Sequence, residues 1–178
     1  MIDLFKAELM RFRWWAAGCA ALQLVVLGFL TRVVDLAQQP LLVYRVFAAV
    51  YAAAGLLLGL YQIGGYRRPN TWLNLLHRPL APSRIAIALL GAGAVLLAAG
   101  VLLPLLGIAA WQETMTARVV DMLHLLLIGS AWIVSVCGYL TGAYLMLADK
   151  RQGYCAAVFL LLIVFSQATG FGAIAIQC

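Results

Sequence analysis

The sequence is poor in charge. Only 10% of its 178 residues are Asp, Glu, Lys or Arg, whereas an average soluble domain carries about 25%. Hydrophobic residues make up 66% of the chain, and its mean hydropathy is +1.02. A water-soluble fold of this length has too little interior to bury so much apolar surface. The composition therefore excludes an ordinary soluble domain and predicts a protein whose solvent is lipid.

Residues for catalysis and for metal binding are also scarce. The four cysteines form no CxxC pair, and we interpret them as small apolar side chains in preference to a disulfide framework or a metal site. His77 and His124 belong to no HExxH motif and fall at opposite sides of the predicted membrane, so they cannot ligate one haem. No G-x-x-x-x-G-K-[ST] loop is present to bind nucleotide phosphates. We therefore predict that the chain is not an enzyme and has no catalytic, cofactor or metal site.

Long uncharged runs dominate what is present. Five stretches contain no Asp, Glu, Lys or Arg: Trp14–Thr31, Val46–Tyr66, Ile85–Gln112, Met122–Ala148 and Gln152–Cys178. A helix needs about 20 residues to cross a hydrocarbon core ~30 Å thick, and in lipid its backbone must satisfy its own hydrogen bonds. We therefore predict an all-α bundle, a single transmembrane domain over 1–178. Its five spans are expected at about 14–31, 46–66, 85–110, 122–147 and 154–176.

The Lys and Arg residues lie in short clusters between these runs. Nine of the twelve fall in the N-terminal segment, the second loop and the fourth loop, which alternating spans place on one side of the membrane. The other three are Arg32, Arg45 and Arg118. Cytoplasmic loops carry an excess of Lys and Arg, so we predict a cytoplasmic N-terminus. The net charge of +6 then orients the chain and indicates no nucleic-acid partner.

Two short segments outside the spans also have helical patterns. In 1–13, apolar residues recur at helical spacing, which predicts an interfacial helix in the headgroup layer; the alternative is a cytoplasmic extension of the first span. The segment Arg67–Arg84 reads RRPNTWLNLLHRPLAPSR, and its prolines predict a short cytoplasmic helix at 69–80. A helix so short needs a packing partner. The alternative here is an ordinary loop with interfacial anchors.

This order of elements resembles that of the ABC-2 type exporter permeases. The resemblance covers about half the chain, from Met1 to Leu90, and rests on the opening LFKAELMRFR and the run LLHRPLAPSRI. The matching residues in the second segment are Trp72, Leu75, Leu76, Pro79, Leu80 and Arg84. Members of this family usually have six spans in each half. The five predicted here depart from that pattern, unless a break such as Pro104 with Gly107 divides one run.

The resemblance implies a function and a set of partners. It implies a permease subunit of an ABC-type exporter, in a bacterial inner membrane, acting as a homodimer with a separate ATP-binding subunit. The first helix would be a connecting helix, and the helix at 69–80 would dock on the ATPase. The implied docking residues are Trp72, Leu73, Leu75, Leu76, His77 and Arg78.

Polar and small residues within the runs suggest how the helices associate. No Asp, Glu, Lys or Arg lies in the uncharged runs to serve as an ionisable relay, which argues against a self-powered secondary transporter. The polar residues either line a path or, more commonly, bond between helices; they are Gln23, Gln62, Ser130, Ser135, Thr141, Ser166, Gln167 and Thr169. Two GxxxG pairs allow close backbone approach, within the bundle or to a second copy, unless they arise by chance. They are Gly55 with Gly59 and Gly138 with Gly142.

Three classes of function remain open on these residues. The permease subunit is the leading hypothesis, and the alternative is a non-catalytic structural or assembly subunit of a membrane complex. A lipid-modifying enzyme is the weakest, because only Asp121 and His124 hint at a site and a polar helix start explains them better.

Overall fold

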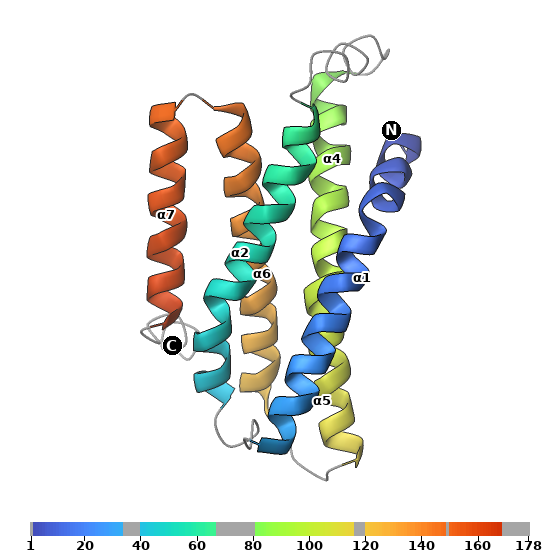
Figure 1. The fold of residues 1–178 in the computed structure, drawn as a ribbon, viewed down its shortest axis with the longest axis vertical. Helices are drawn as coiled ribbons and strands as arrows, with labels where there is room; N and C mark the ends of the chain where they lie inside the picture. Colours follow the sequence, from blue (N-terminus) through green and yellow to red (C-terminus); the bar gives the residue numbers. More distant parts are fainter. Residues whose placement is uncertain (1, 34–39, 67–80, 116–119, 149, 169–178) are drawn as a thin grey trace.

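Seven helical segments make up the part of the chain that the computed structural model describes, which comprises residues 2–33, 40–66, 81–115, 120–148 and 150–168. In order they are α1 (Ile2–Val33), α2 (Pro40–Tyr66), α4 (Pro82–Leu97), η1 (Ala98–Leu102), α5 (Leu103–Met115), α6 (Met122–Leu147) and α7 (Lys150–Ala168). They stand side by side as a bundle of long, roughly aligned helices (Figure 1). The predicted all-α class is confirmed for these residues.

Four of the helical stretches are long and apolar enough to cross a membrane. They are Ile2–Leu30, Phe47–Tyr66, Pro82–Met115 and Met122–Leu147. Large apolar side chains such as Leu22, Val25 and Phe29 are exposed on them, as a surface in contact with lipid requires. The chain is therefore a multi-pass membrane protein. The apolar stretch Gln152–Val164 of α7 is shorter, so the predicted fifth span at 154–176, part of which lies outside the described residues, stays a prediction.

The first span begins earlier than the sequence pattern indicated. The predicted interfacial helix over 1–13, distinct from the span, is wrong: α1 is one helix from Ile2 to Val33. No glycine or proline precedes Gly18 to break it. Its buried residues Leu4, Glu8, Phe12 and Ala16 recur every four positions, so they form one continuous stripe facing the bundle. The alternative interpretation is a cytoplasmic extension of the first span. The structure shows the extension, and its location in the cytoplasm stays a prediction.

The third span passes Pro104 without breaking. A proline lacks the N–H donor and its ring clashes with the carbonyl four residues earlier, here that of Gly100. One turn of π-helix absorbs this conflict: in η1 the Leu103 N–H bonds to the carbonyl of Ala98, five residues back. At Gly100, η1 faces α1, where a Cβ atom would make an ordinary contact of 3.4 Å with the Ala16 carbonyl oxygen. The break considered at Pro104 and Gly107 is therefore absent.

Helices α2 and α6 make the most extensive contact in the described bundle. They run in the same direction (Figure 1), with both GxxxG pairs at the contact. A Cβ atom at Gly59 would lie 2.9 Å from the backbone nitrogen of Ala143, and one at Gly142 would lie 3.0 Å from that of Leu60. Cβ atoms at Gly55 and at Gly138 would likewise meet backbone of the other helix. These faces therefore pack within the bundle.

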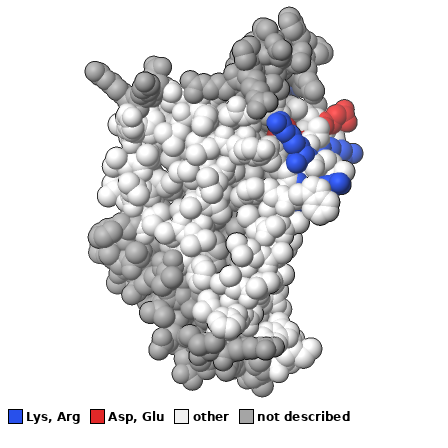
Figure 2. All heavy atoms as spheres, in the orientation of Figure 1, with Lys and Arg blue, Asp and Glu red and all other residues white. Residues whose placement is uncertain are grey.

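The two ends of the bundle differ in charge. Helix α1 begins, α2 ends and α4 begins at one end, while α5 ends and α6 begins at the other (Figure 1). The Lys and Arg side chains visible in Figure 2 gather at the first end, which we call the basic end. The described basic side chains there are Lys6, Arg11, Arg13 and Arg84. That this end faces the cytoplasm stays a prediction.

Because the backbones of α2 and α6 touch at their glycines, a single methyl group added at one of these glycines should destabilise the protein. Gly142→Ala should destabilise the protein by about 1–3 kcal/mol, because the added Cβ overlaps the α2 backbone and overpacking costs this much. Gly129→Ala on the same helix is the control, since a Cβ atom there meets nothing within 4 Å. Thermal unfolding in detergent measures both. Equal midpoints for the two variants would show that the backbones are not in contact.

Candidate functional site

A buried carboxylate is the most unusual feature of the described residues. Glu8 lies two turns into α1 and is only 3% exposed, although its neighbours Lys6 and Arg13 are exposed. Burying a carboxylate is costly unless cations or hydrogen-bond donors compensate it. The position of Glu8 on the buried stripe between Leu4 and Phe12 therefore requires partners from the rest of the bundle.

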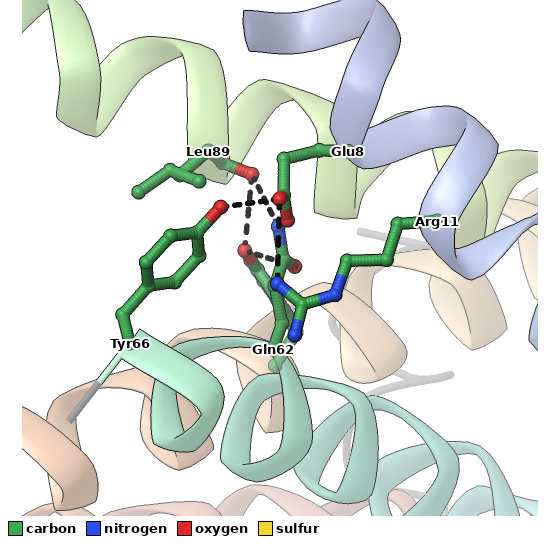
Figure 3. Close-up of polar contacts among 6 residues, drawn as sticks. Glu8, Arg11, Gln62, Tyr66 and Leu89 are labelled. Carbon is green, nitrogen blue, oxygen red and sulfur yellow. Dashed lines mark hydrogen bonds and ion pairs between the residues drawn. The ribbon is translucent and has the colours of Figure 1, made fainter. Parts of the chain in front are cut away.

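Three donor groups surround this carboxylate (Figure 3). Gln62 Nε2 of α2 donates a hydrogen bond of 3.0 Å to Glu8 Oε2, and the Tyr66 hydroxyl, at the end of α2, donates to Oε1. Arg11 Nη1 lies 3.8 Å from Oε1, one turn along α1. The two oxygens thus receive two neutral donors and face one cation. This set compensates an ionised carboxylate.

The network continues from α2 to α4 and α6. Gln62 Nε2 also donates to the Leu89 carbonyl oxygen at 3.2 Å. The Tyr139 hydroxyl of α6 lies 3.0 Å from Gln62 Oε1 and 3.2 Å from the same Leu89 carbonyl, so its one proton is shared between these two acceptors. We call these six residues, Glu8, Arg11, Gln62, Tyr66, Leu89 and Tyr139, the Glu8 cluster. It joins four helices: α1, α2, α4 and α6.

A glycine makes room for the tyrosine of α6. A Cβ atom at Gly93 would lie 2.7 Å from Cε2 of Tyr139 and would also overlap the rest of its phenol end. The absence of a side chain at this position therefore allows the ring to lie against α4 and to reach the Leu89 carbonyl. At Gly91, two residues earlier, a Cβ atom would make only an ordinary contact of 3.7 Å with Phe5. The close fit is thus specific to Gly93.

Apolar side chains enclose the cluster on both sides along the bundle. Leu4, Ile85 and Ala88 pack around Tyr66 and Leu89 toward the basic end. On the deeper side a second group packs around Tyr139; its buried members are Phe12, Ala16, Leu58, Leu96 and Leu97. Hydrogen bonds are stronger in such a water-poor setting, and unpaired polar groups cost more. The cluster is therefore a stiff polar core inside an apolar bundle.

Arg11 connects the cluster to the surface. Its side chain is 46% exposed while that of Glu8 is 4% exposed. The guanidinium carbon lies 5.2 Å from the centroid of the Phe12 ring and 5.7 Å from that of Tyr66, within the range of cation–π attraction. Arg11 thus covers the carboxylate from outside while its charged end stays at the surface of the bundle.

The chemistry available to the cluster is structural and electrostatic. It offers one carboxylate, one guanidinium, two phenols and an amide, with no second carboxylate and no thiol or imidazole among its members. Such a set can hold helices together and bind a positive charge, but it provides no base and nucleophile pair. Nor does the described part of the chain contain three His, Cys, Asp or Glu residues grouped to hold a metal ion.

Sequence reasoning missed Glu8 because it located the first span by uncharged runs. Arg11 and Arg13 pushed the start of that run to Trp14, so the carboxylate was assigned to the headgroup layer. The membrane-length helix Ile2–Leu30 contains it. The argument that no ionisable group lies inside the bundle is therefore wrong. One signal in the sequence could have indicated its burial: Glu8 lies four positions after Leu4 and four before Phe12, so all three share one face of the helix.

The polar residues predicted inside the spans divide into two groups. Gln62, Gln23 and Ser135 bond between helices: Gln23 Nε2 donates to the Tyr51 hydroxyl at 3.2 Å, and Ser135 Oγ donates to the Tyr51 carbonyl at 3.1 Å. Ser130 and Thr141 instead bond to carbonyls of their own helix. The side chains at 166, 167 and 169 lie outside the described residues. Interhelical bonding is thus the role of three of the predicted residues.

The remaining predicted sites have separate outcomes. All six docking residues fall in 67–80, outside the described residues; they are Trp72, Leu73, Leu75, Leu76, His77 and Arg78. At the start of α6 the Asp121 N–H donates to His124 Nδ1 at 3.3 Å, so this pair forms a polar helix start. Cys19, Cys137 and Cys155 are free thiols.

No match was found when the chain was compared with models of protein families, with curated proteins and with solved structures. Its function is therefore inferred from its own residues.

Removing the buried carboxylate should destabilise the bundle. Glu8→Ala leaves the buried Gln62 amide and Tyr66 hydroxyl without their acceptor, which we expect to cost about 2–3 kcal/mol. Asp3→Ala, at an exposed acidic residue five positions earlier on α1, should change stability by no more than about 0.5 kcal/mol. Unfolding in detergent compares the two. Equal losses would mean that Glu8 acts only as a surface charge.

Proposed function

We propose that this chain is the membrane permease subunit of an ABC-type exporter, energised by a separate cytoplasmic ATPase. The observation that supports the proposal most is how helices α2 and α4 are held at the basic end. Tyr66 ends α2 and Pro82 begins α4, so segment 67–80 connects these two helix ends. The Glu8 cluster ties both of them to α1 and α6. A partner bound to the segment would therefore act on a stiffly joined set of helices.

The proposed partner surface is the short helix expected at 69–80. Trp72, Leu73, Leu75 and Leu76 would supply apolar contacts, and His77 with Arg78 would supply polar ones. Tryptophan and arginine are typical of residues that dominate binding energy at protein interfaces. The chain has no nucleotide-binding loop of its own, so ATP hydrolysis would take place on the partner.

The proposed orientation places the basic end in the cytoplasm of a bacterial cell. Its support is the excess of Lys and Arg at that end, which is typical of cytoplasmic loops. The described acidic residues Glu113 and Asp121 lie where α5 ends and α6 begins, at the opposite end. A second copy of the chain would complete the exporter, with the transport path between the two subunits.

The alternative is a non-catalytic structural or assembly subunit of a membrane complex. One observation favours it: α2 and α6 are in backbone contact and leave no passage between them. In addition, the groove of about 380 Å³ among α4, α6 and α7 is mostly apolar; Leu90, Leu140, Ala143, Leu147 and Ala156 line it with Thr141 and Tyr144. A gene for an ATP-binding protein beside the gene of this chain would favour the exporter.

If the ATPase docks on segment 67–80, substitutions in this segment should weaken its association, and substitutions elsewhere should not. Trp72→Glu and Leu76→Glu should abolish co-purification with the proposed ATP-binding partner, because a carboxylate in an apolar interface is strongly unfavourable. Trp111→Glu is the matched control, since Trp111 is an exposed tryptophan at the other end of the bundle. If all three variants retain the ATPase equally, segment 67–80 is not the docking site.

The proposed topology predicts opposite labelling of two engineered cysteines. In a background without the four native cysteines, Asn74→Cys should be protected from a membrane-impermeant maleimide added to intact cells. Ala117→Cys should react, because it lies between α5 and α6 at the opposite end. Reaction of both positions from the same side would contradict the topology and would remove the basis for cytoplasmic ATPase docking.

A further inference from the structure

The described bundle consists of two units that differ in how their helices meet. The first unit is α2 with α6, which touch through backbone at their glycines; α7 packs against both helices and belongs to this unit. The second is α1 with α4, η1 and α5, which contact one another along their length. Between the units, contacts are made by side chains, as in the edge-to-face pair of Phe12 and Tyr61, whose ring centroids lie 5.7 Å apart.

Hydrogen bonds between the two units gather at the basic end. Within the Glu8 cluster, Glu8 of α1 accepts from Gln62 and Tyr66 of α2. The Leu89 carbonyl of α4 accepts from Gln62 and from Tyr139 of α6. Further along, Gln23 of α1 bonds to Tyr51 of α2. Deeper in the bundle, a cluster of apolar side chains packs the two units together; its buried members include Leu27, Val101, Leu105 and Ile128.

Each half of the cluster keeps a partner of its own if the units separate. Arg11 is on the same helix as Glu8 and stays within reach of its carboxylate. In the other unit, Tyr139 keeps its bond to Gln62 Oε1, because α2 and α6 remain joined. The Leu89 carbonyl belongs to α4 and stays with Glu8 and Arg11. Separation therefore leaves the carboxylate and the amide oxygen paired. The Gln62 Nε2 and Tyr66 donors lose their acceptors, and this loss is the cost that keeps the closed state favoured.

We propose that the interface between the α1–α4–α5 unit and the α2–α6 unit opens at the basic end, with the Glu8 cluster as its latch. In the closed state the Gln62 and Tyr66 donors hold Glu8. In the open state Glu8 pairs with Arg11 alone, at the half-exposed position that Arg11 already occupies. Because Tyr66 is the last residue of α2, any partner that pulls on segment 67–80 acts directly on the latch. The opening itself does not depend on the proposed exporter function.

Distances between spin labels in lipid nanodiscs test the latch in the full chain. Labels at Leu57 of α2 and Ile87 of α4 report on the interface between units, and labels at Leu57 and Leu140 of α6 report within one unit; all three residues are exposed. Glu8→Ala should add a longer distance to the first pair and leave the second unchanged. Tyr66→Phe, which removes a single hydroxyl, should raise the open fraction by about three- to tenfold.

Two further variants distinguish a latch that opens from a hydrogen-bond network that only stabilises the closed bundle. Arg11→Ala removes the charge-assisted partner on which Glu8 depends in the open state, together with a weaker cation–π contact to Tyr66 in the closed state. Because the first loss is the larger, the variant should reduce the open fraction, where a general loosening would increase it. Gln23→Leu removes the contact with Tyr51 and should leave the Leu57–Ile87 distances unchanged. The proposal is overturned if Glu8→Ala and Tyr66→Phe both give the wild-type distribution. It is overturned equally if the Leu57–Leu140 pair broadens as much as the first pair, or if Arg11→Ala increases the open fraction.

Discussion

The structure depends on a constraint that lipid imposes: apolar helices gain little by leaving lipid for one another. Helix association in a membrane must instead come from close van der Waals contact and from polar bonds. The chain uses each means in a different place. Glycines bring α2 and α6 into backbone contact, and the Glu8 cluster bonds these two helices to α1 and α4. The first contact is broad and the second is confined to a few atoms.

This division explains why a carboxylate is present in so apolar a chain. A glutamate has two oxygens that can accept several donors, so a single side chain on α1 can engage both Gln62 and Tyr66. Gln62 has donors and an acceptor, and it relays the connection to Leu89 and Tyr139. One buried charge thereby fixes four helices at one level. Its position two turns from the start of α1, where Arg11 reaches the surface, lowers the cost of burying it.

The sequence predicted the helices well because their signals are local. Lack of charge and run length gave the all-α bundle, and the predicted span at 122–147 coincides with α6. The GxxxG spacings indicated faces for close packing, and the structure places Gly55, Gly59, Gly138 and Gly142 at one contact. Spacing alone could not tell whether the contact was internal or between copies, since the geometry of a smooth helix face is the same in both cases.

The Glu8 cluster was beyond such reasoning because its members come from four separate helices. Only Arg11, one turn from Glu8, is near it in sequence; Gln62 and Tyr66 are 54 and 58 positions away. The same basic residues that indicate orientation also concealed the carboxylate, since Arg11 and Arg13 marked this turn of α1 as lying outside the membrane. Arg11 has two roles that a charge count cannot separate. It adds to the positive excess of the basic end, and it covers the carboxylate that joins the two units. The residue from which an orientation is predicted thus also stabilises the polar core.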